Sequence, residues 1–392
     1  MTSKIPRDEY YALTGDPLGV IFSTTKFVWL KENEPENWEK TAMFSTNQDY
    51  FLKAFGAEGY YTDLSSASRD GMCDVDNHVW ASRMFEVLDI PRDRRPELVT
   101  APGKVVGRIQ KDIADKTGLA EGTLICMGAH DQNCNTFGSG AINDGEAVMV
   151  IGTFGSCFVV SDHPIRDPNQ KLVVKGNHGV GNWTIEAFSA TAASSFRWYR
   201  DTFGDLEIAA GKMLKDDPYN LITKQIDTVP PGANGITFLS YLQGASGARL
   251  NGNARGVFCG MSLGTTKADM ARAVMEGICY EMTDILKAEA AAGIDINAIR
   301  LTGGAAKSPT WCQMMADITQ KPIQLLHASE TGCLGAALYA GIGAGIYKDP
   351  ADATKSVHVI KTYEPNPANF AAYEDAFKRF SDLYEALEGR VF

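Results

Sequence analysis

Short apolar runs that end in glycine recur along this chain, and segments with helical spacing of apolar residues separate them. The apolar runs at residues 124–127 and 147–151 each stop at a glycine, and so does the predicted strand at residues 299–302, Ile-Arg-Leu-Thr. Runs this short and continuous are typical of strands buried on both faces. The pattern therefore predicts an α/β protein. Its main predicted helices cover residues 7–14, 192–203, 267–292 and 368–387.

Capping residues mark two further helix starts. Ser23 or Thr24 can cap a helix in the segment that contains Trp29. Ser308 follows a Gly-Gly turn and precedes Pro309, which suits the first turn of a helix. The small residues near 138–145 are the expected boundary between two domains, residues 1–142 and residues 143–392.

Polar residues follow two of the predicted strands at their carboxyl ends. His130, Asp131 and Gln132 come after the run at 124–127, and the small-residue turn Gly152–Ser156 comes after the run at 147–151. In open sheets, chemistry collects at the ends of strands. A carboxylate can serve as a base, and a glycine-rich turn offers backbone N–H groups to a phosphate. Together they favour phosphoryl transfer.

Composition narrows the class of partner. The chain of 392 residues carries a net charge of -11, without a basic run, which argues against nucleic acid and anionic membranes as partners. The longest apolar-rich segment, residues 334–346, is too short to cross a bilayer. The first ten residues lack the apolar core of a signal peptide, and the eight cysteines include no Cys-x-x-Cys pair. Reduced thiols in the cytoplasm are therefore expected, without a zinc site.

Four segments together resemble the FGGY family of carbohydrate kinases. They are Thr24–Asn33, Gly128–Gln132 with the turn Gly152–Gly155, Arg255–Met261 with Asp269–Gly277, and Thr302–Asp317 with Glu330–Ala337. A Gly-Gly turn before a helix is common by itself. Four segments in the family's order, over nearly the whole chain, form a specific pattern.

The resemblance implies two actin-like (ribonuclease-H-like) domains, with the sugar bound by the first and the nucleotide by the second. It also implies an ATP- and Mg²⁺-dependent transfer of the γ-phosphoryl group to an alcohol group of a sugar or polyol, a reaction that depends on positioning and charge neutralisation. Asp131 would be the general base and a substrate ligand, and Gln132 would bind a neighbouring hydroxyl. The implied nucleotide ligands are Gly152, Thr153 and Gly155 for the phosphates, Gly303 and Gly304 for the adenosine, and Ser308 for the base or ribose.

Simpler explanations exist for most of these residues. An aspartate at a strand end is usually a turn former, and glycine permits positive φ in any tight turn. Ser308 is already explained as a helix cap. His130 is expected to be a packed neighbour of the base, and Lys26 and Lys307 to be solvated surface residues, so none of the three is included in the site.

One departure from the family is large. FGGY kinases carry about a hundred further residues at the start, with an Asp-x-Gly-Thr turn that holds phosphate and magnesium, and this motif does not occur here. The resemblance therefore predicts an incomplete first domain, a remnant of the sugar-binding side, and little kinase activity from this polypeptide alone.

The sugar is indicated only weakly. Ile21 occupies the place of a tyrosine that contacts glycerol in glycerol kinases, and the segments around Gly303 and Glu330 are most similar to the L-xylulose kinase branch. A ketopentose such as xylulose, or a polyol, is favoured. The alternatives are another phosphotransferase of the actin-like superfamily and an inactive or regulatory nucleotide- and sugar-binding remnant. The oligomeric state stays open, with a homodimer among the options.

Overall fold

The computed structural model describes residues 1–177 and 182–392, which form two compact units. Unit 1 comprises residues 1–145, 159–186 and 330–358, and unit 2 comprises residues 146–158, 187–329 and 359–392. Each unit is thus assembled from distant parts of the chain. Among the described residues, no helix combines the length and the apolar character needed to span a membrane.

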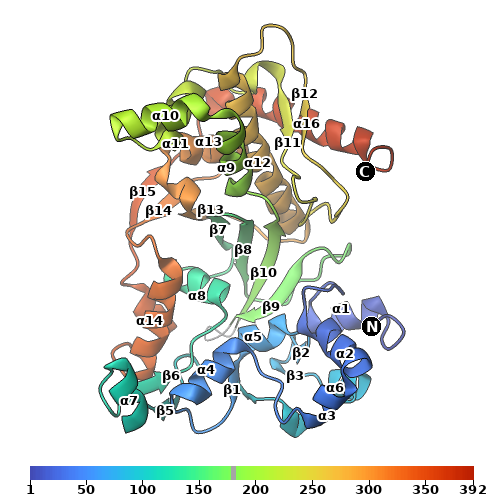
Figure 1. The fold of residues 1–392 in the computed structure, drawn as a ribbon, viewed down its shortest axis with the longest axis vertical. Helices are drawn as coiled ribbons and strands as arrows, with labels where there is room; N and C mark the ends of the chain where they lie inside the picture. The colour runs from blue at the N-terminus through green and yellow to red at the C-terminus, as the bar shows by residue number, and fades with distance from the viewer. Residues whose placement is uncertain (178–181) are drawn as a thin grey trace. The chain divides into compact units, whose positions relative to one another are not determined.

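Unit 1 contains mostly short helices and strands (Figure 1). They are α1 (Arg7–Thr14), α2 (Ser23–Asn33), α3 (Pro35–Lys40), α4 (Asn47–Phe55), β1 (Tyr61–Asp63), α5 (Leu64–Arg69), β2 (Cys73–Asp74), β3 (Val79–Trp80), α6 (Ser82–Leu88), η1 (Arg92–Arg94), β4 (Glu97–Val99), β5 (Val105–Arg108), α7 (Lys111–Thr117), β6 (Leu124–Cys126), α8 (Asp131–Gly138), β9 (Val173–Asn177), α14 (Thr331–Gly343) and α15 (Pro350–Thr354).

Unit 2 is built on longer elements. They are β7 (Glu146–Ile151), α9 (Ala193–Phe203), α10 (Asp205–Leu214), α11 (Pro218–Ile226), η2 (Ala233–Gly235), β11 (Thr237–Leu239), β12 (Val257–Cys259), α12 (Lys267–Ala291), β13 (Ala298–Gly303), η3 (Gly304–Lys307), α13 (Pro309–Thr319), β14 (Ile323–Leu326), β15 (Val359–Tyr363), η4 (Pro367–Asn369) and α16 (Phe370–Leu387). Strands β8 (Gly155–Ser161) and β10 (Asn182–Ser189) each have residues in both units.

The sheet of unit 2 brings two distant glycine turns together. Its strand order is β15-β14-β13-β7, in which β13 runs parallel to both β7 and β14. Ile151, the last residue of β7, pairs with Gly303, the last residue of β13. Parallel strands end at the same edge of a sheet, so the turns that follow β7 and β13 are neighbours.

A tight helix crossing lies in unit 1, where α8 and α14 pack side by side (Figure 1). A Cβ atom at Gly138 would lie 1.9 Å from the carbonyl oxygen of Thr331, and one at Gly335 would lie 1.9 Å from that of Cys134. Only glycine allows the two backbones to approach this closely. The crossing fixes the start of α8, where Asp131 lies.

Most of the predicted elements are confirmed. The expected strands at 124–127, 147–151 and 299–302 correspond to β6, β7 and β13, and the expected helix at 267–292 is α12. The final helix starts at Phe370, two residues later than expected, because a 3-10 turn precedes it. The hydroxyl oxygen of Ser308 accepts a hydrogen bond from Trp311 N at 3.3 Å, so this cap is confirmed.

The expected cap of α2 is wrong. The residue at the cap position is Phe22, which makes no side-chain cap. Tertiary partners take up both hydroxyls instead: Ser23 Oγ donates to Asp70 Oδ1 at 2.7 Å, and Thr24 Oγ1 lies 3.1 Å from the hydroxyl of Tyr10.

Candidate active site

Asp131 opens helix α8 in unit 1, directly after the loop that follows β6. Its side chain is 78% exposed, so the carboxylate is open to a ligand. Gln132 N–H donates to Asp131 Oδ1 at 2.7 Å and lies 3.4 Å from His130 Nδ1. The dipole of α8 favours a negative charge at this position. One carboxylate oxygen is therefore held by the backbone, and the other is available to a ligand.

The imidazole of His130 caps α8 by accepting a hydrogen bond from Gln132 N–H. Burial lowers the pKa of His130, and the positive charge of Lys175 lowers it further, against the opposing effect of Asp131. The imidazole is accordingly neutral at physiological pH. This agrees with the expectation that His130 is a packed neighbour of Asp131.

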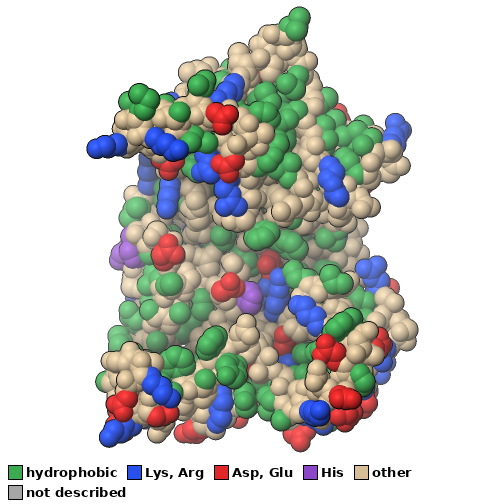
Figure 2. All heavy atoms as spheres, viewed as in Figure 1, with side chains coloured by type: hydrophobic (Ala, Val, Ile, Leu, Met, Phe, Trp, Pro, Cys, Tyr) green, Lys and Arg blue, Asp and Glu red, His purple; other side chains and the backbone are tan. Residues whose placement is uncertain are grey.

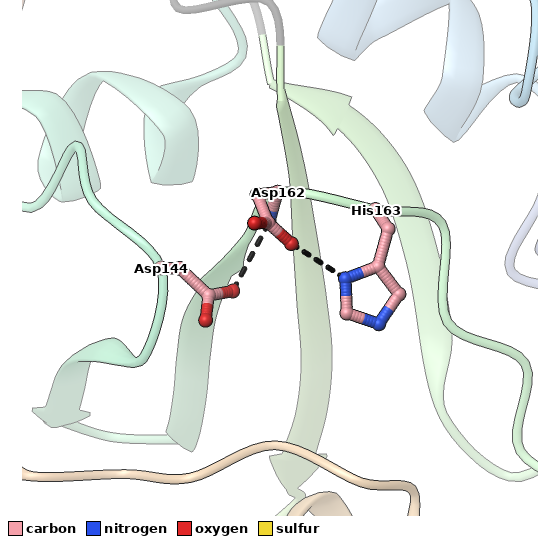
Figure 3. Close-up of side chains that lie close together, drawn as sticks. All are labelled: Asp144, Asp162 and His163. Atoms are coloured by element: carbon pink, nitrogen blue, oxygen red, sulfur yellow. Dashed lines mark hydrogen bonds and ion pairs between the residues drawn. The ribbon is translucent and has the colours of Figure 1, made fainter.

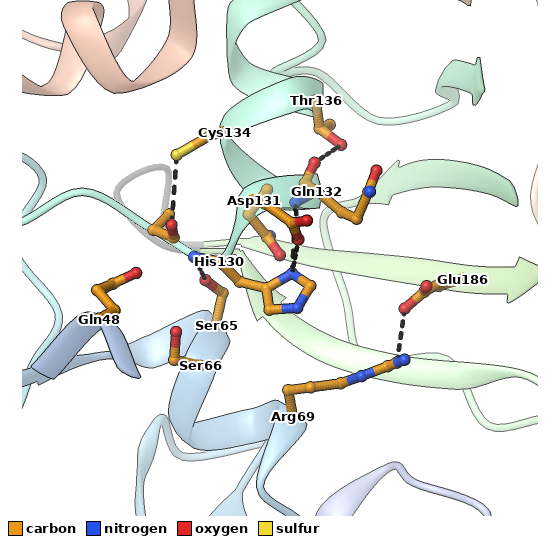
Figure 4. A network of polar contacts seen from close by, with 12 residues as sticks. Gln48, Ser65, Ser66, Arg69, His130, Asp131, Gln132, Cys134, Thr136 and Glu186 are labelled. Carbon is orange, nitrogen blue, oxygen red and sulfur yellow. Dashed lines mark hydrogen bonds and ion pairs between the residues drawn. The ribbon is translucent and has the colours of Figure 1, made fainter. Parts of the chain in front are cut away.

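Helix α5 supports the loop that carries Asp131 (Figure 4). The side chain of Asp63 caps α5 by accepting from Ser65 N at 2.8 Å and Ser66 N at 3.1 Å, and it also binds the hydroxyl of Ser65. The oxygen of that hydroxyl accepts a hydrogen bond from His130 N at 3.0 Å. Asp-Leu-Ser-Ser is a recognisable cap pattern, but its contact with the loop at His130 depends on the tertiary fold and was not predicted.

A buried network of charges lies beside His130. Lys175 forms an ion pair with Glu186. Arg69 Nη1 lies 3.0 Å from the same carboxylate (Figure 4). Burial opposes ionisation of Glu186, but Lys175 and Arg69 outweigh it and lower the pKa of Glu186 to about 2. Burial raises the pKa of Asp16, the fourth member, although Arg69 and Lys175 oppose that rise.

In unit 2, one cavity of about 380 Å³ brings together both predicted nucleotide segments. Gly152 and Thr153 line it after β7, and Gly304 and Ser308 line it after β13. The carbonyl groups of Gly152 and Thr153 accept hydrogen bonds from Ala193 N at 2.8 Å and from Ser194 Oγ at 2.8 Å. The turn after β7 is therefore anchored on the start of α9, which lines the same cavity.

Two of the predicted nucleotide ligands do not line this cavity. Gly303 has a φ of +85°, and a Cβ there would lie 2.6 Å from the carbonyl oxygen of Ile151, so the turn after β13 requires glycine. Gly155 is buried at the start of β8, where a Cβ would lie 2.7 Å from Met282 Sδ. Close packing thus explains the glycine at 155. The contact of Gly155 with phosphate stays a prediction.

Aromatic side chains form one wall of the cavity. Phe196 stacks on Tyr219 at 5.6 Å between ring centroids and meets Trp311 edge-on at 5.3 Å. The guanidinium of Arg200 lies 4.6 Å from the centroid of Tyr219. Because both Phe196 and Arg200 already pack on its ring, Tyr219 serves as a wall rather than as a platform for stacking a base.

Three exposed side chains in unit 1 are of the types that can bind a metal ion. Donor atoms of Asp144, Asp162 and His163 lie within 4.8 Å of one another, all exposed (Figure 3). Asp162 N donates to Asp144 Oδ1 at 3.1 Å, and His163 Nδ1 lies 2.6 Å from Asp162 Oδ1. Exposed acidic groups are common on protein surfaces, so this group is not part of the candidate site.

The two halves of the predicted site are therefore each well formed, in different units. Asp131 and Gln132 belong to unit 1, whereas the glycine turns belong to unit 2. That the carboxylate faces the nucleotide stays a prediction. Family models for the C-terminal and N-terminal domains of the FGGY family of carbohydrate kinases match residues 147–344 and 1–138, respectively. This chain belongs to the FGGY family of carbohydrate kinases.

Several relatives in the family match this chain over most of its length. It is 30% identical over 376 residues to a xylulose kinase of Staphylococcus epidermidis, covering 95% of this chain and 73% of that protein. It is 29% identical over 386 residues to a gluconokinase of Bacillus licheniformis, covering 96% and 73%. The structure of ligand-bound xylulose kinase from Lactobacillus acidophilus matches with a TM-score of 0.90 at 26% identity, covering 98% and 76%.

These findings establish the fold and the reaction class. The FGGY kinase has the two-domain actin-like fold expected from the sequence, and it is an ATP-dependent carbohydrate kinase that acts on a small sugar. The match over residues 1–138 shows that the N-terminal domain is present in this chain. The chain spans about 73% of the length of its first relatives.

Proposed function

We propose that this FGGY kinase transfers the γ-phosphoryl group of ATP to a hydroxyl of a ketopentose such as xylulose, with Asp131 as the general base. The observation that carries the proposal is the exposed carboxylate of Asp131, with one oxygen held by Gln132 N–H at 2.7 Å and the other available to a substrate hydroxyl. The side chain of Gln132 would bind a second hydroxyl. A positioned base and a preorganised phosphate site suffice for phosphoryl transfer, because the reaction needs little covalent chemistry from the protein.

The nucleotide is proposed to lie in the cavity of unit 2, with its phosphates near Gly152, Thr153 and Gly155 and its adenosine along Gly303, Gly304 and Ser308. Residues 1–142 would then form the sugar side and residues 143–392 the nucleotide side. In support, Gly152, Thr153, Gly304 and Ser308 line one cavity although about 150 residues separate the two turns.

Magnesium is expected to act on the phosphates of the nucleotide. The cavity offers one carboxylate, Asp217, whose Oδ1 accepts from Tyr219 N at 2.9 Å to cap α11. Mg²⁺ sites in kinases usually combine one or two carboxylates with waters and substrate phosphates. The single carboxylate of this cavity already caps α11, so no step is assigned to a metal held by the cavity residues.

A sugar acid such as gluconate is the second candidate substrate. Its support is the guanidinium of Arg69, whose side chain is 22% exposed and whose charge acts on His130, next to Asp131. A substrate carboxylate could bind such a group through charge-assisted hydrogen bonds.

An ATP-consumption assay with xylulose, gluconate and glycerol tests the reaction and ranks the substrates. We expect sugar-dependent turnover with xylulose, which Asp131→Asn lowers by about a thousandfold because the proton acceptor is lost, with ATP binding nearly unchanged. Asp115→Asn, an exposed aspartate on α7, is the control and should behave as wild type. Turnover that survives Asp131→Asn would refute the assignment of the base.

The same assay tests the expectation that this polypeptide alone turns over slowly. Robust turnover by the isolated chain would contradict that expectation. ATP binding without turnover of any sugar would instead favour a regulatory remnant. A homodimer and a cytoplasmic location stay predictions, which light scattering and cell fractionation can check.

A further inference from the structure

The cavity of unit 2 carries positive charge in a chain that is acidic as a whole. Its charged lining residues are Arg197, Lys307 and Asp217, whereas the net charge of the chain is -11. Figure 2 shows several Lys and Arg side chains, with Asp and Glu side chains among them, on the face formed by α9, α10 and α11. A cationic wall on an acidic protein favours an anionic ligand at that place.

Arg197 is directed to the cavity by the face of α9 that it occupies. It lies one turn after Ala193, whose N–H binds the carbonyl oxygen of Gly152 at 2.8 Å, and both residues line the cavity. Residues four positions apart share one face of a helix. The loop after β7 and the guanidinium of Arg197 are thus presented to the same space.

The side chain of Arg197 is available for a ligand. It is exposed, and within residues 1–177 and 182–392 it makes no hydrogen bond or ion pair. Arg200, one turn further along α9, differs in both respects: it forms an ion pair with Asp201 and packs on the ring of Tyr219. The contrast marks Arg197 as the arginine of α9 that has no structural task.

Lys307 reaches the cavity from the other glycine turn. It ends η3, the 3-10 turn that starts at Gly304, and it is exposed. Its ammonium group likewise has no hydrogen-bond or ion-pair partner in the part of the chain that the structure describes. The pairing of Ile151 with Gly303 brings this turn to the same sheet edge as Gly152.

We propose that Arg197 and Lys307 bind the phosphate chain of the nucleotide and make the cavity selective for nucleoside di- and triphosphates over monophosphates and nucleosides. The inference rests on the proposed nucleotide site. Arg offers a fork of donors to phosphate oxygens, and Lys offers a mobile point charge. The two cations flank the cavity from α9 and from η3, so each can engage a phosphate without displacing a protein partner.

Binding measurements on the full chain test the proposal. Dissociation constants for ADP, AMP and adenosine are measured by calorimetry, with and without Mg²⁺, for wild type, Arg197→Gln and Lys307→Gln. Each substitution should weaken ADP binding by about tenfold, the usual effect of one charge-assisted hydrogen bond, and leave adenosine binding unchanged. Arg197→Lys should restore part of the loss.

Lys212→Gln is the matched control. Lys212 is an exposed lysine of α10 that does not line the cavity, so its removal changes the net charge equally and should leave ADP binding as in wild type. ADP affinity unchanged in Arg197→Gln and Lys307→Gln would overturn the inference. An equal loss for adenosine and ADP would overturn it too, because the residues would then act on the base or on the fold. A wild-type chain that binds none of the three ligands would refute the proposed nucleotide site itself.

Discussion

The buried carboxyl group of Glu281 on α12 couples the stability of unit 2 to pH. Glu281 is buried, and Ser240 Oγ donates to its Oε2 at 2.5 Å. Burial raises the pKa of Glu281 from 4.5 to about 7, against the opposing hydrogen bonds of Ser240 and Ser189. The folded state therefore holds a proton that the unfolded state releases above pH 4.5. Its contribution to stability is full below that pH and is lost as the pH rises through about 7.

Glu281→Gln should remove this pH dependence. A raised pKa of this size corresponds to about 3 kcal/mol across the window, since one pKa unit is worth about 1.4 kcal/mol. We expect the variant to lose less stability than wild type between pH 5 and about 8, as measured by urea unfolding. Glu385→Gln, which removes an exposed carboxylate of α16, is the control and should keep the wild-type profile. Parallel curves for Glu281→Gln and wild type would contradict the argument.

At the scale of elements, the crossing of α8 and α14 positions the candidate base. Thr331, the first residue of α14, hydrogen-bonds Asn135 of α8 through its hydroxyl, and Gly335 meets the backbone of Cys134. The contact at Gly335 thus joins two backbones rather than two flexible side chains. A backbone cannot move aside as a side chain can, so overpacking here must separate the helices.

Gly335→Ala should therefore destabilise unit 1 by about 3 kcal/mol, at the upper end of the usual cost of overpacking. Gly332→Ala on the same helix is the matched control. The nearest atom to a Cβ at Gly332 lies 3.9 Å away, so that substitution should be neutral or slightly stabilising. Thermal denaturation of both variants measures the difference. Equal melting temperatures would mean that the helices can separate without cost.

At the scale of the whole molecule, the two units carry different tasks. Unit 1 presents Asp131 and Gln132 on an exposed helix start, and unit 2 encloses a cavity whose lining is partly apolar and partly cationic. A ligand that binds only the folded state adds stability in proportion to the logarithm of its concentration. Nucleotide binding to unit 2 should therefore raise the stability of the folded chain even without turnover.

ADP at about a hundred times its dissociation constant should stabilise the chain by about 2.7 kcal/mol. Scanning calorimetry should show the rise in the transition that includes unit 2, where the cavity lies. Xylulose is the comparison ligand, since its proposed contacts, Asp131 and Gln132, lie in unit 1. An unchanged melting profile at saturating ADP would count against the nucleotide site.

The local sequence pattern determined where several strands and helices of this molecule lie. The apolar runs specify the strands β6 and β7, Ser308 and Pro309 specify the start of α13, and the capping box of Thr266 and Asp269 starts α12. These features depend on neighbours within a few residues, so they are legible in a sequence. The family resemblance added the reaction class, which the family models confirm.

Tertiary structure alone decided which residues share a site. Parallel pairing sets Ile151 opposite Gly303 across 152 positions of sequence, and this register gathers the cavity lining, including Arg197 and Lys307. Ser23 does not cap α2, because its hydroxyl donates a hydrogen bond to Asp70, 47 residues away. Such partners are selected by burial and backbone pairing over long range, and a local pattern does not encode them.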